Sequence, residues 1–388
     1  MTVWDDLVGQ AEPVEVLQHA VLRSSRMLAG EHLHGVPHAW LFTGPPGSGR
    51  SIAARAFAAG LQCLEGGCGT CHACTTTLAG SHPDLEVVAT EATIIPVREA
   101  RALIQIAQRH PRLGRWRVIL VEDADRLNDQ AANALLKTIE EPPVRTVWLL
   151  CAPSPQDVLT TIRSRCRSVR LRVPPVDAVA ALLVRRDGVD PAMAAYAARA
   201  AQSHIGRALR LARDEGARMR RRDVLELAFA VRGVGDAVLR AGQLVELAAE
   251  ESAAATVDRD AGERSALLRA LGFDGESRLP PSVRSQVRDL EEDQRRRATR
   301  FKKDAIDRAL MDLLSVYRDV LVLHLGAEVE LVNASERTQL VRLVDSTTPE
   351  EVLRRMDAIG VTRERLTTNA NPLLAVEAMA LKLVPAEA

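Results

Sequence analysis

Short runs of apolar residues alternate with longer amphipathic stretches over the first 172 residues of the chain. Runs that are apolar throughout are typical of strands buried on both faces, whereas a strand with one solvent-facing side alternates polar and apolar positions. On this basis strands are predicted at residues 40–43, 85–88, 117–122 and 146–151. The amphipathic stretches predict helices at residues 11–24, 51–61, 97–108 and 129–140. This alternation predicts a parallel sheet with helical crossovers.

The pattern changes at Val173-Pro174-Pro175, and only helices are predicted after this point. Residues 176–215 are enough for a small helical lid, with helix ends predicted at Gly188 and Gly206. After a basic run at residues 218–222 the chain is predicted to be helical almost to its end. Three domains are therefore predicted, at residues 1–173, 174–217 and 218–388.

Within the C-terminal helices, glycine and proline residues predict a loop between residues 272 and 281. The stretch 291–303 is strongly charged, and we interpret it as a solvated helix face, with a contact to DNA as the alternative. Apolar side chains then recur at helical spacing and predict a buried face. These residues are Ile306, Leu310, Leu313, Leu314, Tyr317 and Leu321.

Composition narrows the class of protein. The 388 residues include 51 Lys and Arg and 51 Asp and Glu, so net charge predicts neither nucleic acid nor membrane as a partner, although local patches can bind either. The first residues lack the basic and apolar regions of a signal peptide, and no stretch approaches ~18 uninterrupted apolar residues. We therefore expect a soluble, cytoplasmic protein whose cysteines are kept reduced.

A glycine-rich segment follows the first predicted strand and precedes a predicted helix. It reads Gly44-Pro-Pro-Gly47-Ser-Gly49-Arg50-Ser51, a phosphate-binding loop (P-loop) with arginine in the place of lysine. In such a loop backbone N–H groups surround phosphate oxygens and the hydroxyl holds Mg²⁺. The planar guanidinium of Arg50 cannot occupy the place of a flexible ammonium without rearrangement, so a non-hydrolytic site is predicted. Binding of ATP or ADP with Mg²⁺ stays open.

The third predicted strand ends in two further candidate residues, Glu122 and Asp123. An ATPase of this class carries Asp and then Glu here, one to aid the Mg²⁺ ion and the other to polarise water. The order is reversed in this chain, which leaves the carboxylate of Asp123 one methylene short of the usual base. The alternative is a charged strand end that faces solvent.

Four of the six cysteines are clustered, at Cys63, Cys68, Cys71 and Cys74. Two successive Cys-x-x-Cys steps bring three thiolates together, and Cys63 can complete a tetrahedral site. A Zn²⁺ ion with four protein ligands has no open position, so it would be structural. His72 and His82 are spare ligands, and two disulfides or free thiols are the alternatives. Cys151 is predicted to be a core residue.

Arginines flank Ser164 in the segment Arg163-Ser164-Arg165-Cys166, between the last predicted strand and the double proline. By itself, this pattern is more typical of a solvated helix end than of a functional site, because arginines are common on protein surfaces.

A longer motif changes that interpretation. Residues 131–143 read Ala-Ala-Asn-Ala-Leu-Leu-Lys-Thr-Ile-Glu-Glu-Pro-Pro. Together with Val8-Gly9-Gln10, the P-loop, the cysteines and Ser164-Arg165-Cys166, this string resembles the clamp-loader branch of the AAA+ ATPases over residues 4 to about 215. The resemblance implies an α/β AAA+ P-loop domain with a parallel sheet and an inserted zinc module, then an all-α lid and an all-α C-terminal collar domain.

Clamp loaders of this family form pentameric rings that open the sliding beta clamp with ATP and load it onto primer–template DNA. The resemblance therefore implies gamma/tau motor subunits, a delta subunit, the beta clamp and DNA as partners. Each ATP lies at a subunit interface, where the arginine of a Ser-Arg-Cys motif reaches the neighbour's ATP. By this resemblance Arg165 is a trans-acting arginine finger, a group worth ~10³–10⁵ in rate.

Several positions depart from the motor subunits of this family. A polar residue is missing near Ala152-Pro153, and Gly206 stands where a motor has arginine, with Arg207 adjacent. With Arg50 and the inverted Glu122-Asp123 pair, these departures imply a stator, a subunit that activates its neighbour while its own site is inert. The alternatives are a working gamma/tau-like motor and a helicase or recombination-type AAA+ protein. No carboxylate constellation of a polymerase is recognised.

Overall fold

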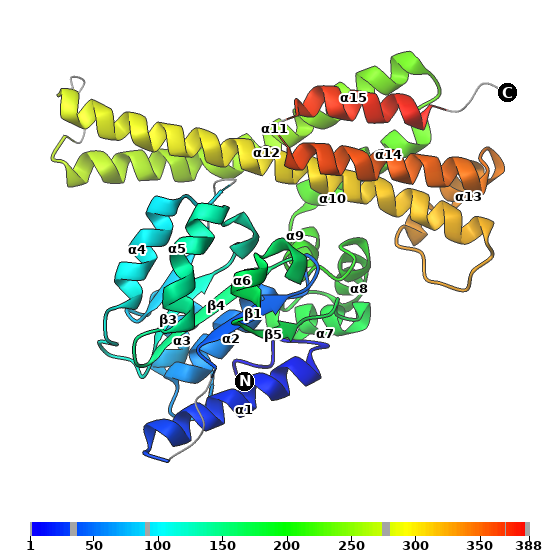
Figure 1. Ribbon diagram of the computed structural model, residues 1–388. Coiled ribbons are helices and arrows are strands. Elements are labelled where there is room, and N and C mark those ends of the chain that lie inside the picture. The colour runs from blue at the N-terminus through cyan, green and yellow to red at the C-terminus, as the bar shows by residue number, and fades with distance from the viewer. Residues whose placement is uncertain (1, 32–36, 90–93, 274–279, 369, 385–388) are drawn as a thin grey trace. The chain divides into compact units, whose positions relative to one another are not determined.

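The computed structural model describes residues 2–31, 37–89, 94–273, 280–368 and 370–384 (Figure 1). The chain divides into two compact units, Met1–Arg213 and Asp214–Ala388. None of the helices in the described ranges combines the length and the apolar character that crossing a bilayer requires.

The first unit is built on a five-stranded sheet in the order β2-β3-β4-β1-β5. Its strands are β1 Ala39–Thr43, β2 Leu85–Val88, β3 Arg117–Val121, β4 Thr146–Ala152 and β5 Arg167–Arg170. Neighbouring strands pair in parallel, which confirms the predicted α/β fold. Strand β5 was not predicted, because Val169 is its only buried apolar residue.

Helices cover both faces of this sheet (Figure 1). They are α1 Ala11–Leu28, α2 Arg50–Gln62, α3 His72–Leu78, α4 Val97–Ala107, α5 Asp129–Glu140 and α6 Thr160–Arg163. Successive residues of β1 point to opposite faces, so Trp40 and Phe42 pack with α1 and α2 while Leu41 packs with α4 and α5. Strands β1, β3 and β4 are buried at every position, which is why the predicted runs had short, continuous apolar cores.

The helices after the sheet are α7 Val176–Asp187, α8 Pro191–Ala200 and α9 Ile205–Arg213. Helix α7 ends at Gly188, which is left-handed with φ 65°, as the sequence predicted. The predicted helix end at Gly206 is wrong, because this residue lies inside α9. The break comes earlier, where Gln202 and Ser203 adopt φ of 50° and 65°. Non-glycine residues in this conformation give no sequence signal.

The second unit consists of helices α10 Glu215–Ala230, α11 Val234–Ala270, α12 Pro281–His324, α13 Arg337–Asp345, α14 Pro349–Thr367 and α15 Pro372–Leu383. The apolar face predicted for α12 is the centre of its core, with Ile306, Leu310, Leu313 and Tyr317 almost completely buried. Most of the predicted 272–281 loop lies outside the described residues.

The charged stretch of α12 is not solvated throughout. Arg297 is only 5% exposed, and its two terminal nitrogens lie 2.8 and 2.7 Å from the carboxylate oxygens of Glu263 on α11. These hydrogen bonds hold the pKa of Glu263 at about 2. The prediction of a solvated face is therefore wrong at Arg297, because α11 packs along this part of α12 and supplies acidic partners.

Candidate functional site

The P-loop connects β1 to α2. Gly47 and Gly49 both have φ of 86°, a left-handed conformation that glycine adopts without steric cost, and Gly49 is the N-cap of α2. The side chain of Arg50 turns back, and its Nη1 donates a hydrogen bond of 2.6 Å to the carbonyl oxygen of Gly44. The only cation of the P-loop motif is therefore bound by the loop itself.

The segment before α9 covers the middle of the P-loop. His204 packs so closely that a Cβ atom at Gly47 would lie 2.8 Å from the Cα of His204. Buried Gln10 holds the loop from the other side, since its Nε2 donates to the carbonyl oxygens of Ser48 and Arg172, at 3.3 and 2.6 Å. These contacts from distant segments hold the loop in place.

The two acidic residues after β3 are both paired with arginines. Glu122 accepts a hydrogen bond of 2.9 Å from Nε of Arg55 on α2, whose Nη2 lies 2.8 Å from the same oxygen. Asp123 lies 3.8 Å from Arg126. Both carboxylates are half-buried, so this acidic strand end is only partly exposed to solvent. A Mg²⁺ ion that used Glu122 would have to compete with the guanidinium of Arg55.

The two other positions that departed from the motor pattern have roles in the fold. Pro153, after β4, accepts a hydrogen bond of 3.2 Å from the backbone N–H of Gly44 through its carbonyl oxygen. The backbone N–H of Arg207 donates to Nδ1 of His204 at 3.3 Å, which helps to cap the start of α9.

Arg165 lies just beyond α6, and every nitrogen of its guanidinium has a partner. Its Nε lies 3.0 Å from Oε2 of Glu140, and its Nη2 donates to Oε1 of the same residue at 3.2 Å. Its Nη1 donates to the carbonyl oxygen of Thr161 at 2.9 Å. The partner Glu140 comes from the Glu-Glu-Pro-Pro end of α5, so the two motifs that carried the family resemblance contact each other. The arginine side chain is 34% exposed.

The four clustered cysteines form a candidate metal centre. Sulfur atoms of Cys63, Cys68, Cys71 and Cys74 lie within 4.8 Å of one another. The Sγ of Cys63 is 3.7 Å from those of Cys68 and Cys71. None of the four forms a disulfide bond, and the 3.7 Å separation agrees with the ~3.8 Å edge of a tetrahedron with Zn–S bonds of ~2.3 Å. The four residues could therefore hold one metal ion.

The backbone around the cysteines is arranged for thiolates. N–H groups of Glu65 and Cys68 point at the sulfur of Cys63, at 3.3 and 3.5 Å, and that of Cys74 points at the sulfur of Cys71 at 3.4 Å. Such donors orient metal ligands and stabilise their negative charge. Among the described residues neither histidine joins this cluster, and His82 instead accepts a hydrogen bond from the backbone N–H of Asp84. Cys151 is completely buried, as predicted, and burial raises the pKa of its thiol.

A loop before β3 supports the metal centre, and no sequence pattern pointed to it. Arg115 in this loop donates through Nη1 to the carbonyl oxygen of Cys63 at 2.9 Å. Completely buried Asp84 anchors the same loop by accepting the backbone N–H groups of Arg112, Leu113 and Gly114 at 2.6–2.8 Å. Asp84 also forms an ion pair of 3.0 Å with Arg117.

Replacing Asp84 by asparagine is expected to lower the free energy of unfolding by ~3–5 kcal/mol, because it leaves Arg117 buried without its counter-charge. Burial acts to raise the pKa of Asp84, but the three backbone donors and Arg117 hold it below its usual value. The carboxylate therefore stabilises the fold above pH ~4, the unfolded pKa, and this contribution is lost as pH falls through the folded pKa. Urea unfolding at several pH values measures both effects. Exposed Glu15→Gln is the control, and equal midpoints for the two variants would contradict the assignment.

Comparisons with known proteins agree with these motifs. Residues 24–175 match the family model described as DNA polymerase III, delta subunit. The delta' subunit of Pseudomonas aeruginosa is 41% identical over 145 residues, which are 36% of this chain and 44% of that protein. The tau/gamma subunit of Haemophilus influenzae is 37% identical over 172 residues, 43% of this chain and 23% of that protein. The chain thus spans less than half the length of these relatives.

Among solved structures, a DNA polymerase III gamma subunit-related protein from Thermotoga maritima is 16% identical and covers 89% of this chain and 99% of that one. Its TM-score of 0.33 is too low to support a conclusion. The sequence matches do support a conclusion about the family. Residues 24–175 match a DNA polymerase III delta-subunit family model and are similar to delta' subunits, which confirms the predicted resemblance.

Proposed function

We propose that the chain acts as the delta' subunit of a bacterial DNA polymerase III clamp loader. In this role it is a stator: its own nucleotide site does not hydrolyse ATP, and Arg165 acts on the ATP of a neighbouring motor subunit. One contrast carries the proposal. In its own site, Arg50 is bound by the P-loop carbonyl of Gly44 and Glu122 by Arg55, whereas the partly exposed Arg165 is bound by a carbonyl and by the exposed side chain of Glu140.

The contacts at the P-loop explain why this site would be inert. Phosphoryl transfer depends on positioned charge, with a cation on the terminal phosphates and a carboxylate that orients water. Here the guanidinium of Arg50 donates to the loop's own carbonyl, and Arg55 neutralises Glu122. A nucleotide bound at this loop would find neither group in a catalytic position.

The contacts of Arg165 suit a group that changes partners. An ion pair between partly exposed side chains is worth only about 0–1 kcal/mol, so the pair with Glu140 is easily exchanged. The polyphosphate of ATP offers more negative charge and bidentate acceptors for the same guanidinium. Before a neighbour is present, Glu140 and the carbonyl of Thr161 keep the side chain ordered.

Further assignments follow from the same role. We propose that Cys63, Cys68, Cys71 and Cys74 hold a structural Zn²⁺ ion, which would fix the module inserted between α2 and β2. We propose residues 1–173 as the AAA+ core, 174–217 as its lid and 218–388 as the collar. The partners would be gamma/tau motor subunits and a delta subunit, with the beta clamp and primer–template DNA as substrates of the complex.

The isolated chain is expected to show no ATP hydrolysis above background, and Arg50→Lys alone is expected not to restore it, because the Arg55–Glu122 pair and His204 remain in place. A phosphate-release assay measures this, with a gamma/tau subunit as the positive control. The second candidate is a gamma/tau-like motor, which the identity to the Haemophilus protein favours. Rapid hydrolysis by the isolated chain would establish that candidate and exclude the stator.

A further inference from the structure

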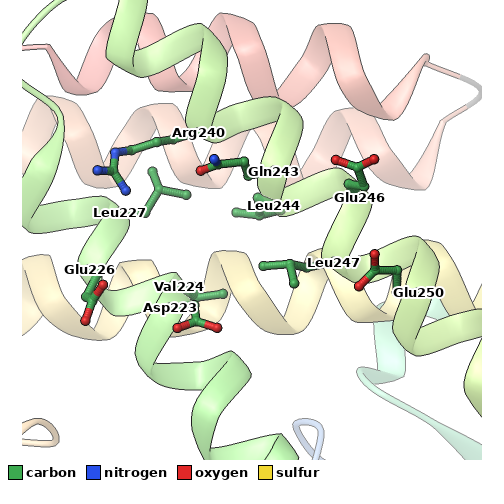
Figure 2. Close-up of a pocket in the computed structure, with 10 residues that line it drawn as sticks. All are labelled: Asp223, Val224, Glu226, Leu227, Arg240, Gln243, Leu244, Glu246, Leu247 and Glu250. Carbon is green, nitrogen blue, oxygen red and sulfur yellow. The ribbon is translucent and has the colours of Figure 1, made fainter.

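A groove between α10 and α11 in the second unit combines an apolar floor with an acidic rim (Figure 2). It has a volume of about 370 Å³. Its floor is formed by Val224, Leu227, Leu244 and Leu247. Its rim carries four exposed carboxylates, those of Asp223, Glu226, Glu246 and Glu250. Among the described residues that line it, Arg240 is the only cation.

The rim carboxylates differ from several others in this unit, which are paired with arginines. Glu251 on α11 pairs with Arg308 of α12 at 2.8 Å, and Asp307 on α12 pairs with Arg363 of α14 at 2.7 Å. The four rim carboxylates form no ion pair with any residue that the structure describes. Helices of this unit thus supply arginines to some of one another's acidic residues, but among the described residues no arginine pairs with the rim carboxylates. The rim keeps a negative charge that an occupant can neutralise.

Exposed apolar side chains extend the groove along both helices. Leu239 is 64% exposed on α11, and it lies four residues before Gln243 and seven before Glu246, on the same helix face. Met219 is 52% exposed on α10 and lies four residues before Asp223 and seven before Glu226, on the same face of that helix. Methionine and leucine in such places are typical of surfaces that bind other proteins.

We propose that this groove is a docking site for a basic amphipathic helix of another protein chain. An apolar stripe on that helix would enter the floor at Leu244 and Leu247, and Lys or Arg residues beside the stripe would pair with the rim. Charge decides between occupants: nucleic acid and acidic helices would be repelled by four carboxylates. Because Arg240 repels cations, the Lys or Arg residues of the occupant would lie toward the other end of the groove, near Glu246 and Glu250. This inference does not depend on the role of Arg165.

The test uses a labelled model helix of about 20 residues, with leucines at positions i, i+3, i+4 and i+7 and lysines elsewhere. Fluorescence anisotropy with the full-length chain at low salt is expected to show saturable binding. The double variant Glu246→Lys/Glu250→Lys is expected to weaken it at least tenfold, or about 1.4 kcal/mol. Asp357→Lys/Glu364→Lys is the matched control, because it makes the same charge change at exposed positions of α14 and is expected to leave binding unchanged.

Thermal unfolding of both double variants shows whether they fold. If Glu246→Lys/Glu250→Lys does not fold, Glu246→Gln/Glu250→Gln is used instead, and this variant is expected to weaken binding about threefold or more. A second peptide, with serines in place of the leucines, tests whether binding requires the apolar floor of the groove or only its charged rim. The proposal predicts that this peptide does not bind. Equal loss of binding in the groove and control variants, or equal binding of the two peptides, would overturn it.

Discussion

Replacing Arg165 by alanine is expected to reduce clamp loading by a reconstituted complex at least tenfold while the complex still assembles. An arginine finger stabilises charge on the transferring phosphoryl group and is worth ~10³–10⁵ in rate at the site it serves. A smaller loss is expected for the whole reaction, because the remaining interfaces keep their own arginines. Assembly should be unaffected, because among the residues that the structure describes the only side-chain partner of Arg165 is the weakly paired, exposed Glu140.

The measurement is the rate at which beta clamps are loaded onto primed DNA, with the size of the complex checked separately. Arg170→Ala is the matched control, since it removes an exposed arginine of β5 from the same region. Arg165→Lys should be nearly as defective as Arg165→Ala, because an ammonium cannot bind phosphate oxygens with two nitrogens. Loading at the unaltered rate by the alanine variant would remove Arg165 from the proposed mechanism.

Loss of the metal centre is expected to have the largest effect on stability. Cys74 is completely buried, and its replacement by serine removes one of four ligands from a site whose metal affinity is coupled to folding. We expect one Zn²⁺ ion per wild-type chain, loss of this ion in Cys74→Ser, and a decrease in Tm of the first unit of about 10 °C or more. Elemental analysis and thermal unfolding measure the two effects.

Cys166→Ala provides the control for this experiment. Cys166 is half-buried outside the cluster, and burial raises its pKa to about 12, so it is a neutral thiol without a metal-binding role. This variant should keep its zinc and most of its stability. A wild-type protein without bound zinc, or a Cys74→Ser variant as stable as wild type, would show that the cluster is only a group of thiols.

The sheet could be predicted from sequence because the apolar character of each buried strand shows in a run of consecutive residues. Strands covered on both faces are buried at every position and therefore mostly apolar, and β1, β3 and β4 are apolar except at one end residue each, Thr43, Arg117 and Thr146. The P-loop could also be predicted, since its glycines and its place between a strand and a helix are consecutive in the chain. Strand β5 could not, because it is an edge strand with a single buried side chain.

The state of the candidate site could not be predicted, because it depends on pairs of residues far apart in sequence. Glu122 and Asp123 were expected at a metal or at a solvent-exposed strand end, and only the fold brings Arg55 to Glu122. The contact of His204 with Gly47 arises because the segment before α9 returns to the P-loop. Sequence motifs therefore identified the residues of the site but not which of them are already paired.

The most direct test of the proposed division of roles is ATP hydrolysis in a single turnover, measured for the isolated chain and for the reconstituted complex with either wild-type chain or Arg165→Ala. The stator role predicts no hydrolysis by the isolated chain and hydrolysis by the wild-type complex. It also predicts loss of the hydrolysis at one subunit interface in the Arg165→Ala complex. Hydrolysis by the isolated chain, or an Arg165→Ala complex that hydrolyses as much ATP as wild type, would contradict it.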